Sequence, residues 1–361
     1  MYRSSLGGTA FSSLVDYPID FFRFVKESIM IRFEKDQKDQ VAFLANQLLS
    51  EAKKTAVKNL KEAGQSSGPI TLDEQIPVMY GWLEAIERDY SPEKKAICEG
   101  FVSYSIDDFK LYCGDLINEL LLTITSNRFC PKGFSERFIY ALYNILRSTA
   151  HIYLPTTELI FWGYGEQDVF PSYHSFVISA SIDGMIKWTR KSKYEVSNSS
   201  PACVEPFAQT DVSNTVVRGI DDNLRRQFYS SNGRIISLFK QEIVAALTAS
   251  GAPKKVVDVI GSIDTEKYSA VFQKGMDQFI QANYVQKLVD TVNYLSKEDI
   301  ADMAESLVRM TCLKRHITTD EETVGGPVDV AVITKGDGFI WLKRKHYFTP
   351  EINHHFFERR K

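Results

Sequence analysis

The sequence has few cysteines, and none of them is placed for a disulfide framework or a zinc site. Five cysteines are scattered along 361 residues, and no two of them form a C-x-x-C pair. Disulfide-rich secreted domains and structural zinc sites place their cysteines in close, repeated spacings. We therefore expect a protein of the reducing cytosol, without disulfides, and the cytoplasm is the predicted location.

Long apolar runs and a strong charge imbalance are also absent. No stretch approaches the roughly 18 apolar residues that span a bilayer, and the first residues lack the basic and apolar regions of a secretory signal. The net charge is -3, which argues against a dedicated nucleic-acid binder. Neither a membrane nor a nucleic acid is expected as a partner.

Motifs for metal, nucleotide and serine-hydrolase sites are missing. Neither H-E-x-x-H nor G-x-S-x-G occurs. Gly163-x-Gly165 runs to Pro171 and a second strand, whereas a dinucleotide site needs a following helix. His346 and His354-His355 could bind a metal, but a basic C-terminal tail explains them more simply. The sequence therefore predicts no cofactor and no metal.

What the sequence does contain is a first half patterned as helices. The length allows about two domains, and 44% of the residues are apolar. The segment 34–63 places its apolar residues on one face and many lysines on the other, which is typical of a helix over a core. The helices predicted from such patterns span 14–32, 34–63, 73–88, 105–125 and 135–152.

Strand patterns begin after Pro155. Residues 158–162 predict one strand, and 175–181 and 185–189 predict two more that flank Asp183-Gly184, a hairpin signal. Helical patterns then resume over 211–247 and 266–294.

The segment 296–342 is the most informative part of the chain. Ser296 is placed to cap a helix. Paired glycines precede 328–333, a nearly all-apolar run typical of a strand covered on both faces, and Asp337-Gly338 predicts a hairpin turn before the return strand 339–342. The helix carries an apolar stripe that we expect to be buried, formed by Ile300, Met303, Ala304, Leu307, Val308 and Leu313.

Two segments together resemble the proteasome-like branch of the N-terminal-nucleophile hydrolases. Residues 157–184 read as an apolar strand ending in glycine, a proline-containing loop, and a strand carried to an Asp-Gly turn, and 296–342 read as a helix, Gly-Gly and a hairpin. More closely, 206–210 (PFAQT), 303–307 (MAESL) and 323–333 (TVGGPVDVAVI) are similar to an uncharacterised bacterial group related to proteasome subunits.

The resemblance implies an α+β fold, a four-layer αββα sandwich with large helical insertions. Its core would comprise 1–32, 129–222 and 295–348, with 33–128 and 223–294 as insertions and 349–361 as a basic tail. The family's first strand pair has no counterpart, because the chain passes from Met1-Tyr2-Arg3 almost directly into a helix. That absence would leave a sheet edge open, so self-association or related subunits are the expected partners.

Thr9 is the first candidate catalytic residue. In the family, an N-terminal Thr, Ser or Cys supplies the nucleophile and its α-amine accepts the proton. Gly8-Thr9 resembles a self-processing junction, but Val25 and Val41 stand where the acidic and lysine partners would be counted from Thr9. A loop threonine that caps the helix from Leu14 is the interpretation that the sequence favours.

Glu321 is the second candidate. It matches the acidic residue that the family places before a Ser-Gly-Gly sequence, but Val324 stands in place of the serine. The sequence therefore favours a solvated loop carboxylate at Glu321.

Two functions follow from the resemblance. The first is a threonine-type peptidase or amidohydrolase of peptide or protein substrates, catalytically incomplete as written because its N-terminal strands were lost by truncation or a misplaced start codon. The alternative is a non-catalytic assembly or protein-interaction subunit that binds partners through the helical insertions.

Overall fold

A computed structural model describes residues 10–27, 33–64, 68–124, 133–208, 210–317 and 326–345, together with residues 352, 353, 355 and 358. The secondary structure is mixed, with helices and small antiparallel sheets, which confirms the predicted α+β class. The chain forms two compact units, Met1–Glu195 and Val196–Lys361. None of the described helices is long and apolar enough to cross a membrane.

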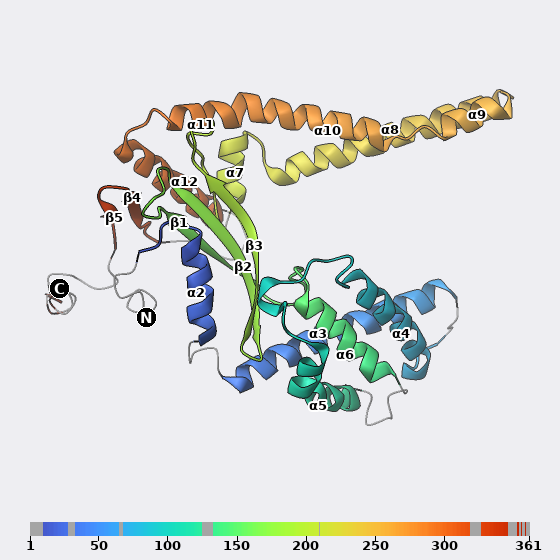
Figure 1. Ribbon diagram of the computed structural model, residues 1–361. Helices are drawn as coiled ribbons and strands as arrows, with labels where there is room; N and C mark the ends of the chain where they lie inside the picture. The colour runs from blue at the N-terminus through green and yellow to red at the C-terminus, as the bar shows by residue number, and fades with distance from the viewer. Residues whose placement is uncertain are drawn as a thin grey trace. The chain divides into compact units, whose positions relative to one another are not determined.

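The sheet of the first unit is a three-stranded antiparallel meander (Figure 1). Its strands are β1 (Thr157–Gly163), β2 (Ser172–Ile182) and β3 (Met185–Glu195), in the order β1-β2-β3. Asp183 and Gly184 both have positive φ angles, 50° and 69°, as a two-residue type I′ turn requires. The hairpin predicted from Asp-Gly is confirmed.

Helix α2 (Asp16–Glu27) covers one face of this sheet (Figure 1). The Phe22 ring stacks on Trp188 with 4.4 Å between centroids. Phe21 meets Phe161 of β1 edge-on. Ring pairs of this kind add to the apolar burial, so α2 is fixed on the sheet by aromatic contacts.

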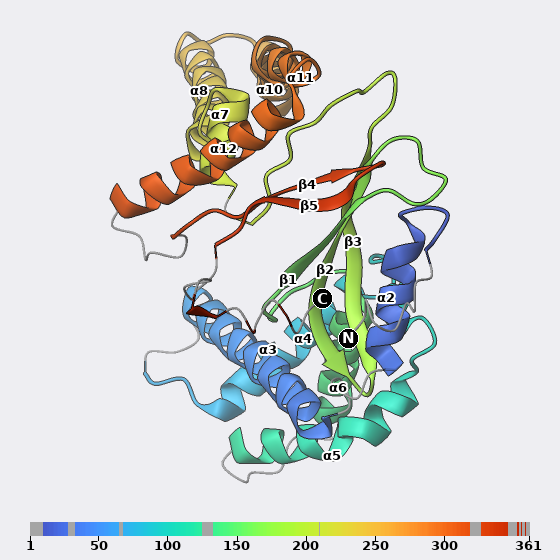
Figure 2. The same ribbon diagram turned by 90° about the vertical axis from the view of Figure 1, so that its left-hand side faces the viewer.

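Four helices form a bundle at the turn end of the β2–β3 hairpin (Figures 1 and 2). They are α3 (Glu34–Glu62), α4 (Leu72–Asp89), α5 (Ile106–Ile124) and α6 (Phe134–Arg147), with the short 3-10 helix η2 (Glu99–Phe101) before α5. The apolar stripe predicted for α3 is buried in the bundle. It consists of Val41, Leu44, Leu48, Ala52 and Ala56.

Strand β2 and helix α6 also contribute to the core of the bundle. Ala180 and Ile182 enter it from β2, and α6 packs in it against α4. The amide of Asn144 on α6 donates to the Glu87 carbonyl of α4 at 3.1 Å. Thus α6, which the resemblance assigns to a sandwich core, shares a hydrophobic core with helices of 33–128; the division into core and insertions stays a prediction.

The second unit is mainly helical. Its elements are α7 (Asp211–Arg218), α8 (Asp222–Ala249), α9 (Lys254–Gly261), α10 (Glu266–Ile280), the π-helical segment η3 (Gln281–Val285), α11 (Gln286–Val292), α12 (Lys297–Ile317), β4 (Val330–Thr334) and β5 (Gly338–Lys343). The helix predicted over 211–247 is two helices, because Gly219 ends α7 with a φ of 69°. A Cβ at Gly219 would lie 2.3 Å from the Tyr284 ring, so both conformation and packing require glycine there.

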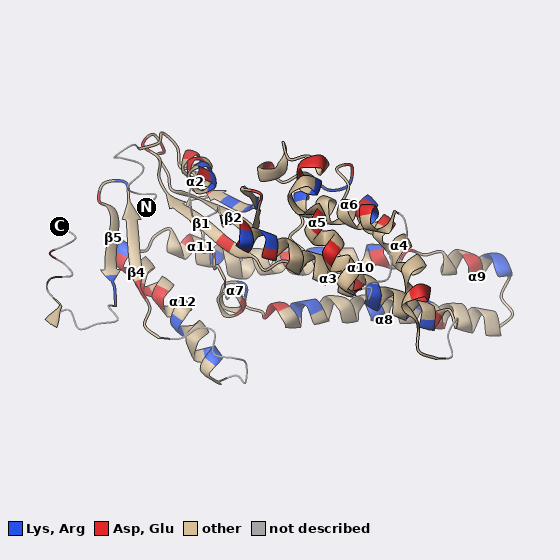
Figure 3. Ribbon diagram, turned by 90° about the horizontal axis from the view of Figure 1, so that it is seen from below, with Lys and Arg blue, Asp and Glu red and all other residues tan. Residues whose placement is uncertain are grey.

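Helix α12 begins as predicted, but it buries a different face. The hydroxyl of Ser296 accepts from the Asp299 amide at 3.1 Å, and acidic residues lie in the first turn and basic ones in the last (Figure 3). The predicted stripe is wrong, because Val308 and Leu313 are exposed. The buried residues of α12 are Ala301, Glu305 and Thr311.

The physical reason is a polar contact between α12 and the hairpin. Glu305 is paired with both Lys343 of β5 and Arg309 of its own helix. A carboxylate that binds two cations can be buried. Because Glu305 is buried in this way, the side of α12 that carries Ala301, Glu305 and Thr311 is the buried side.

Strands β4 and β5 form a separate two-stranded sheet. Its turn is closed by Asp337, whose amide donates to Thr334 Oγ1 at 2.8 Å. Every residue of β5 is exposed, and in β4 only Val330 is buried. The expectation that 328–333 is covered on both faces is therefore wrong within the described residues, and the four-layer sandwich stays a prediction.

Candidate functional site

The two predicted catalytic residues, Thr9 and Glu321, lie outside the described residues. The same holds for His346 and His354. In the part of the chain that the structure does describe, no group of three or more His, Cys, Asp or Glu residues is placed to hold a metal ion.

The described residues instead point to a helical arm, which we define as α8, α9 and α10 (Asp222–Ile280). Helix α8 runs antiparallel to α10, with α9 at the far end (Figure 1). None of the 28 residues of α8 is buried, and in α10 only Ile280 is. The arm is thus a helix pair that leaves most of its surface open.

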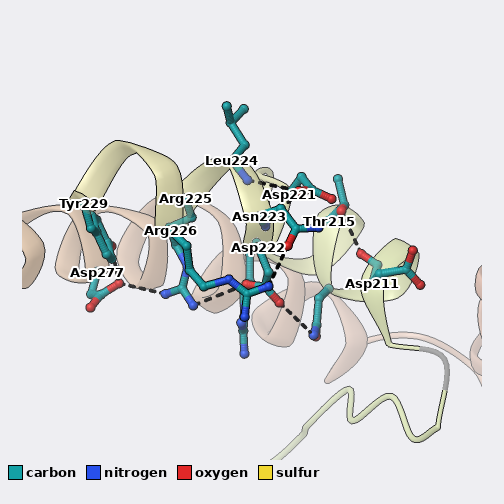
Figure 4. Close-up of polar contacts among 12 residues, drawn as sticks. Asp211, Thr215, Asp221, Asp222, Asn223, Leu224, Arg225, Arg226, Tyr229 and Asp277 are labelled. Atoms are coloured by element: carbon teal, nitrogen blue, oxygen red, sulfur yellow. Dashed lines mark hydrogen bonds and ion pairs between the residues drawn. The ribbon is translucent and has the colours of Figure 1, made fainter. Parts of the chain in front are cut away.

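Polar contacts hold the two helices of the arm together near its base. Asp277 of α10 accepts from the Arg225 guanidinium at 3.0 Å and from the Tyr229 hydroxyl at 2.6 Å (Figure 4). The Arg225 guanidinium also lies 5.8 Å from the centre of the Tyr229 ring, within the range of a cation–π contact.

The same seam continues toward the far end through small and polar residues. Gly233 faces Ser269 closely, with only 3.3 Å between the Ser269 hydroxyl and the place of a glycine Cβ. Further along, the ammonium of Lys240 donates to the carbonyls of Gly261 and Ile263 at 3.0 and 3.1 Å. A cation is favourable at these carbonyls because α9 ends there.

The most exposed apolar residues of the arm lie away from this seam, whereas Phe272 meets Tyr229 edge-on within it. In Figure 4 the Leu224 side chain points away from the contact of Arg225 and Tyr229 with Asp277. On α8 the apolar residues follow separations of four, seven and three, which is the a/d spacing of a coiled-coil seam. We define the apolar side of the arm as the exposed residues Leu224, Phe228, Ile235, Leu238 and Phe239 of α8 with Tyr268, Val271 and Phe279 of α10.

A shallow groove of about 320 Å³ runs along this side. Leu224, Phe228 and Ile235 line it from α8, and Phe272 lines it from α10. Phe228 is 53% exposed and Ile235 is 64% exposed. Exposed apolar patches that are this continuous mark binding surfaces in soluble proteins.

The base of the arm is anchored within its own unit. Asp211 of α7 binds Lys314 and Arg315 of α12 at 3.1 and 3.0 Å. Burial pushes the pKa of Asp211 up, but the hydrogen bond and charge of Lys314 and the charge of Arg315 outweigh it and hold the pKa below its ordinary value. Asp221 then caps α8 by accepting from the amides of Asn223 and Leu224.

The first unit holds the most perturbed titratable groups. His151 Nδ1 is hydrogen-bonded to Ser179 Oγ at 2.8 Å, and Nε2 to Thr189 Oγ1 at 2.6 Å. Burial, with the positive charge of Lys187, lowers the pKa of His151 to about 4. The neutral imidazole therefore ties β2 to β3, with both ring nitrogens engaged.

Ser179 also lines an apolar cavity of about 750 Å³ between α2, α3 and the first two strands. A serine beside a histidine suggests nucleophilic catalysis, but an effective base has a pKa near the working pH. His151 is far below that value, and its second nitrogen contacts the Thr189 hydroxyl rather than an orienting carboxylate. The arrangement is structural.

Lys187 is the other unusual group, since only 1% of it is exposed. Its ammonium donates to the Ile145 carbonyl in the last turn of α6 at 2.7 Å. Burial lowers its pKa to about 8. Nearby, the Cys98 thiol donates to the Trp188 carbonyl, and burial raises the pKa of Cys98, which makes it a poor nucleophile.

Sequence reasoning placed the arm in a helical insertion but missed its exposed apolar side. The a/d spacing of Leu224, Phe228, Ile235 and Leu238 was the available signal. That spacing alone predicts a buried stripe, because nothing in it tells which side of α8 meets α10.

In comparisons with known proteins, no family model, no curated protein and no solved structure matches the chain.

Proposed function

We propose that this protein is a non-catalytic assembly subunit with a proteasome-like core, and that it joins a second copy of itself through the apolar side of the arm. The observation that carries the proposal is the orientation of the arm. Its helices meet through Arg225, Tyr229, Gly233 and Lys240, while Phe228 and its apolar neighbours face outward.

Burial of the apolar side gives the driving force. Taking a Leu, Ile or Phe side chain out of water stabilises by about 1.5–3 kcal/mol. Each of the eight residues is only about half exposed, so covering all of them gains about 6–12 kcal/mol, which is of the same size as the roughly 4–15 kcal/mol that association costs in lost freedom. A stable complex therefore requires a partner surface that covers most of the apolar side.

A second copy is the partner that fits best. Both helices of the arm carry apolar residues, and these flank the groove between Phe228 and Phe272. Two such helix pairs, placed face to face, form a four-helix bundle with a continuous apolar core. The contact would be isologous, as in most soluble dimers, because each arm presents the same surface to the other.

The sandwich core is part of the same proposal. α2 covers one face of the β1–β3 sheet, and the other face carries a ladder of rings, with Trp162 stacked on Tyr173 at 5.2 Å and Tyr173 on Tyr194 at 6.3 Å. The β4–β5 hairpin exposes Phe339, Ile340, Trp341 and Leu342. Each unit, taken by itself, thus has an apolar sheet face that a further layer can cover, which supports the sandwich core that the resemblance implies.

The peptidase function stays a prediction, and within this sequence its candidate nucleophile is Thr9. It requires a chain that begins at Thr9 with a free α-amine. The intact mass of the purified protein tests it, because a chain that retains Met1 has no nucleophile at this position.

Sedimentation equilibrium of variants tests the assembly. Phe228→Glu and Ile235→Glu together place carboxylates on the apolar side and should convert the dimer to monomer. Leu111→Glu is the matched control, because Leu111 is 90% exposed on α5 of the other unit, and it should leave the mass unchanged. A monomeric wild-type chain, or a double variant that dimerises as well as the wild type, would contradict the proposal.

A further inference from the structure

A polar cavity of about 420 Å³ lies in the first unit. Its volume falls in the range of sites for small molecules. The residues that matter for its chemistry are Asp168, Phe170, His174, Arg190, Lys193 and Glu195.

One wall of the cavity is fixed by backbone contacts. Asp168 Oδ2 accepts from the amides of Leu14 and Gly165 at 2.8 and 2.7 Å. A Cβ on Gly165 would lie 2.3 Å from the Ser13 Cα, so the loop and the N-terminal segment are packed as closely as glycine allows. Because Asp168 Oδ2 already accepts from two backbone amides, we assign this carboxylate a structural role in the cavity wall.

His174 lies in the cavity with hydrogen-bonding capacity to spare. Only 8% of it is exposed, and neither ring nitrogen bonds to any residue that the structure describes. Its Nδ1 is fully buried and has no partner among them. An unsatisfied buried polar atom is costly, and none of the described residues offsets that cost.

Two cations lie on the same side of the sheet as His174. Lys193 is its direct partner across the β2–β3 pair, and Arg190 pairs with Phe176, two residues further along β2. Among the described carboxylates, none forms an ion pair with Arg190 or Lys193. Burial, with the charges of these two cations, lowers the pKa of His174, so its imidazole is neutral at neutral pH and keeps one N–H to donate.

We propose that this cavity binds an oxyanion, a carboxylate or a phosphate, carried on a small apolar group. Arg190 and Lys193 bind the anionic oxygens, and His174 donates its ring N–H to the same group. Phe170 packs against the apolar part of the ligand. Glu195, at the end of β3, disfavours ligands with several negative charges and accepts from any donor that the ligand carries.

Isothermal titration of the full-length chain with benzoate, phenyl phosphate and benzylamine tests this site. The two anions separate a carboxylate from a phosphate preference, and benzylamine presents the same ring with the opposite charge. We expect at least one anion to bind and benzylamine not to bind. Arg190→Gln or Lys193→Gln should weaken anion binding about tenfold or more, since each removes a charge-assisted hydrogen bond.

Lys191→Gln is the matched control. Lys191 is on the same strand but pairs with Glu158 at 2.8 Å and does not line the cavity, so its loss should leave the anion affinity within about twofold, well under the tenfold that 1.4 kcal/mol represents. His174→Phe, which keeps the ring volume, should weaken binding as well.

Three results would overturn the site. The first is that neither anion binds at about 10 mM, a concentration high enough for sites of millimolar affinity. The others are that benzylamine binds as tightly as the anions, or that Arg190→Gln and Lys193→Gln bind the anions as tightly as the wild type does. Circular dichroism of each variant confirms that a lost signal is not lost folding. The outcome is independent of the state of assembly.

Discussion

At the scale of single residues, two basic side chains of the first unit have pKa values well below their ordinary ones: Lys187, which is buried, and His151, which is half-buried. His151 and Lys187 are both on or beside β3, and each is satisfied by hydroxyl or carbonyl oxygens. No carboxylate pairs with either among the described residues. A positive charge on either side chain would therefore have no carboxylate partner, and both should make the folding stability depend on pH.

His151 should make the fold lose stability in acid. Its pKa is about 4 in the folded chain and ordinarily 6.5. As the pH falls from 6.5 toward 4, the unfolded chain takes up the proton and the folded chain does not, so the free energy of unfolding decreases. We expect about 1–2 kcal/mol, after allowance for partial solvent screening.

His151→Gln removes this titration and keeps an amide that can bridge Ser179 and Thr189. Urea unfolding at pH 7 and pH 4.5 should then show a smaller loss for the variant than for the wild type. His316→Gln, at an exposed position on α12, should lose as much as the wild type. Equal losses for His151→Gln and the wild type would refute the assignment.

Lys187 should make the stability of the fold depend on pH in the alkaline range. Its pKa is about 8 in the folded chain and ordinarily 10.5. Between these values the unfolded chain holds the proton that the folded chain has released, so stability rises with pH, by up to about 3 kcal/mol. Lys187→Met should abolish most of this rise between pH 7.5 and 9.5 in urea unfolding, and an unchanged slope would contradict the account.

At the scale of elements, glycines show where the chain packs most closely. Gly165 belongs to the loop after β1, and its missing side chain leaves room for the backbone of Ser12 and Ser13. Gly81, in the middle of α4, has no atom within 4 Å of its Cβ position. The two glycines therefore predict opposite effects of the same substitution.

Gly165→Ala should destabilise the protein by about 2 kcal/mol or more, because backbone must move. Gly81→Ala should stabilise it by up to about 1 kcal/mol, since alanine is the better helix former. Denaturant unfolding of both variants measures the difference. A neutral Gly165→Ala would show that the loop does not rest on the N-terminal segment.

The elements also show what a sequence can predict. Helices α3, α4 and α5 and the β2–β3 hairpin were predictable, because their period, caps and Asp183-Gly184 turn are local signals. The break at Gly219 was not, since its cause is the distant ring of Tyr284. The face of α12 was mistaken for a similar reason: Glu305 is buried only because Lys343 reaches it from β5.

The candidate sites were harder still to predict. The spacing on α8 was visible, but its exposure depends on how α8 meets α10. The cavity of His174 needs β2, β3 and the loop at Asp168 together, and no local pattern brings those residues to one place. The resemblance placed its candidate residues, Thr9 and Glu321, outside the described part of the chain.

At the scale of the whole molecule, the exposed apolar surfaces require a partner. Two surfaces remain apolar in the second unit, the apolar side of the arm and the β5 strand. A chain with such surfaces associates or aggregates in water. A second copy that covers the arm removes the first of these two surfaces from water.

The molar mass of the full-length protein in solution tests this claim most directly. Light scattering during gel filtration, at micromolar concentration and after about a hundredfold dilution, would resolve the species. The account predicts a particle of about twice the 41.1 kDa of one chain, with dissociation only on dilution. A particle of 41.1 kDa at every concentration would contradict it.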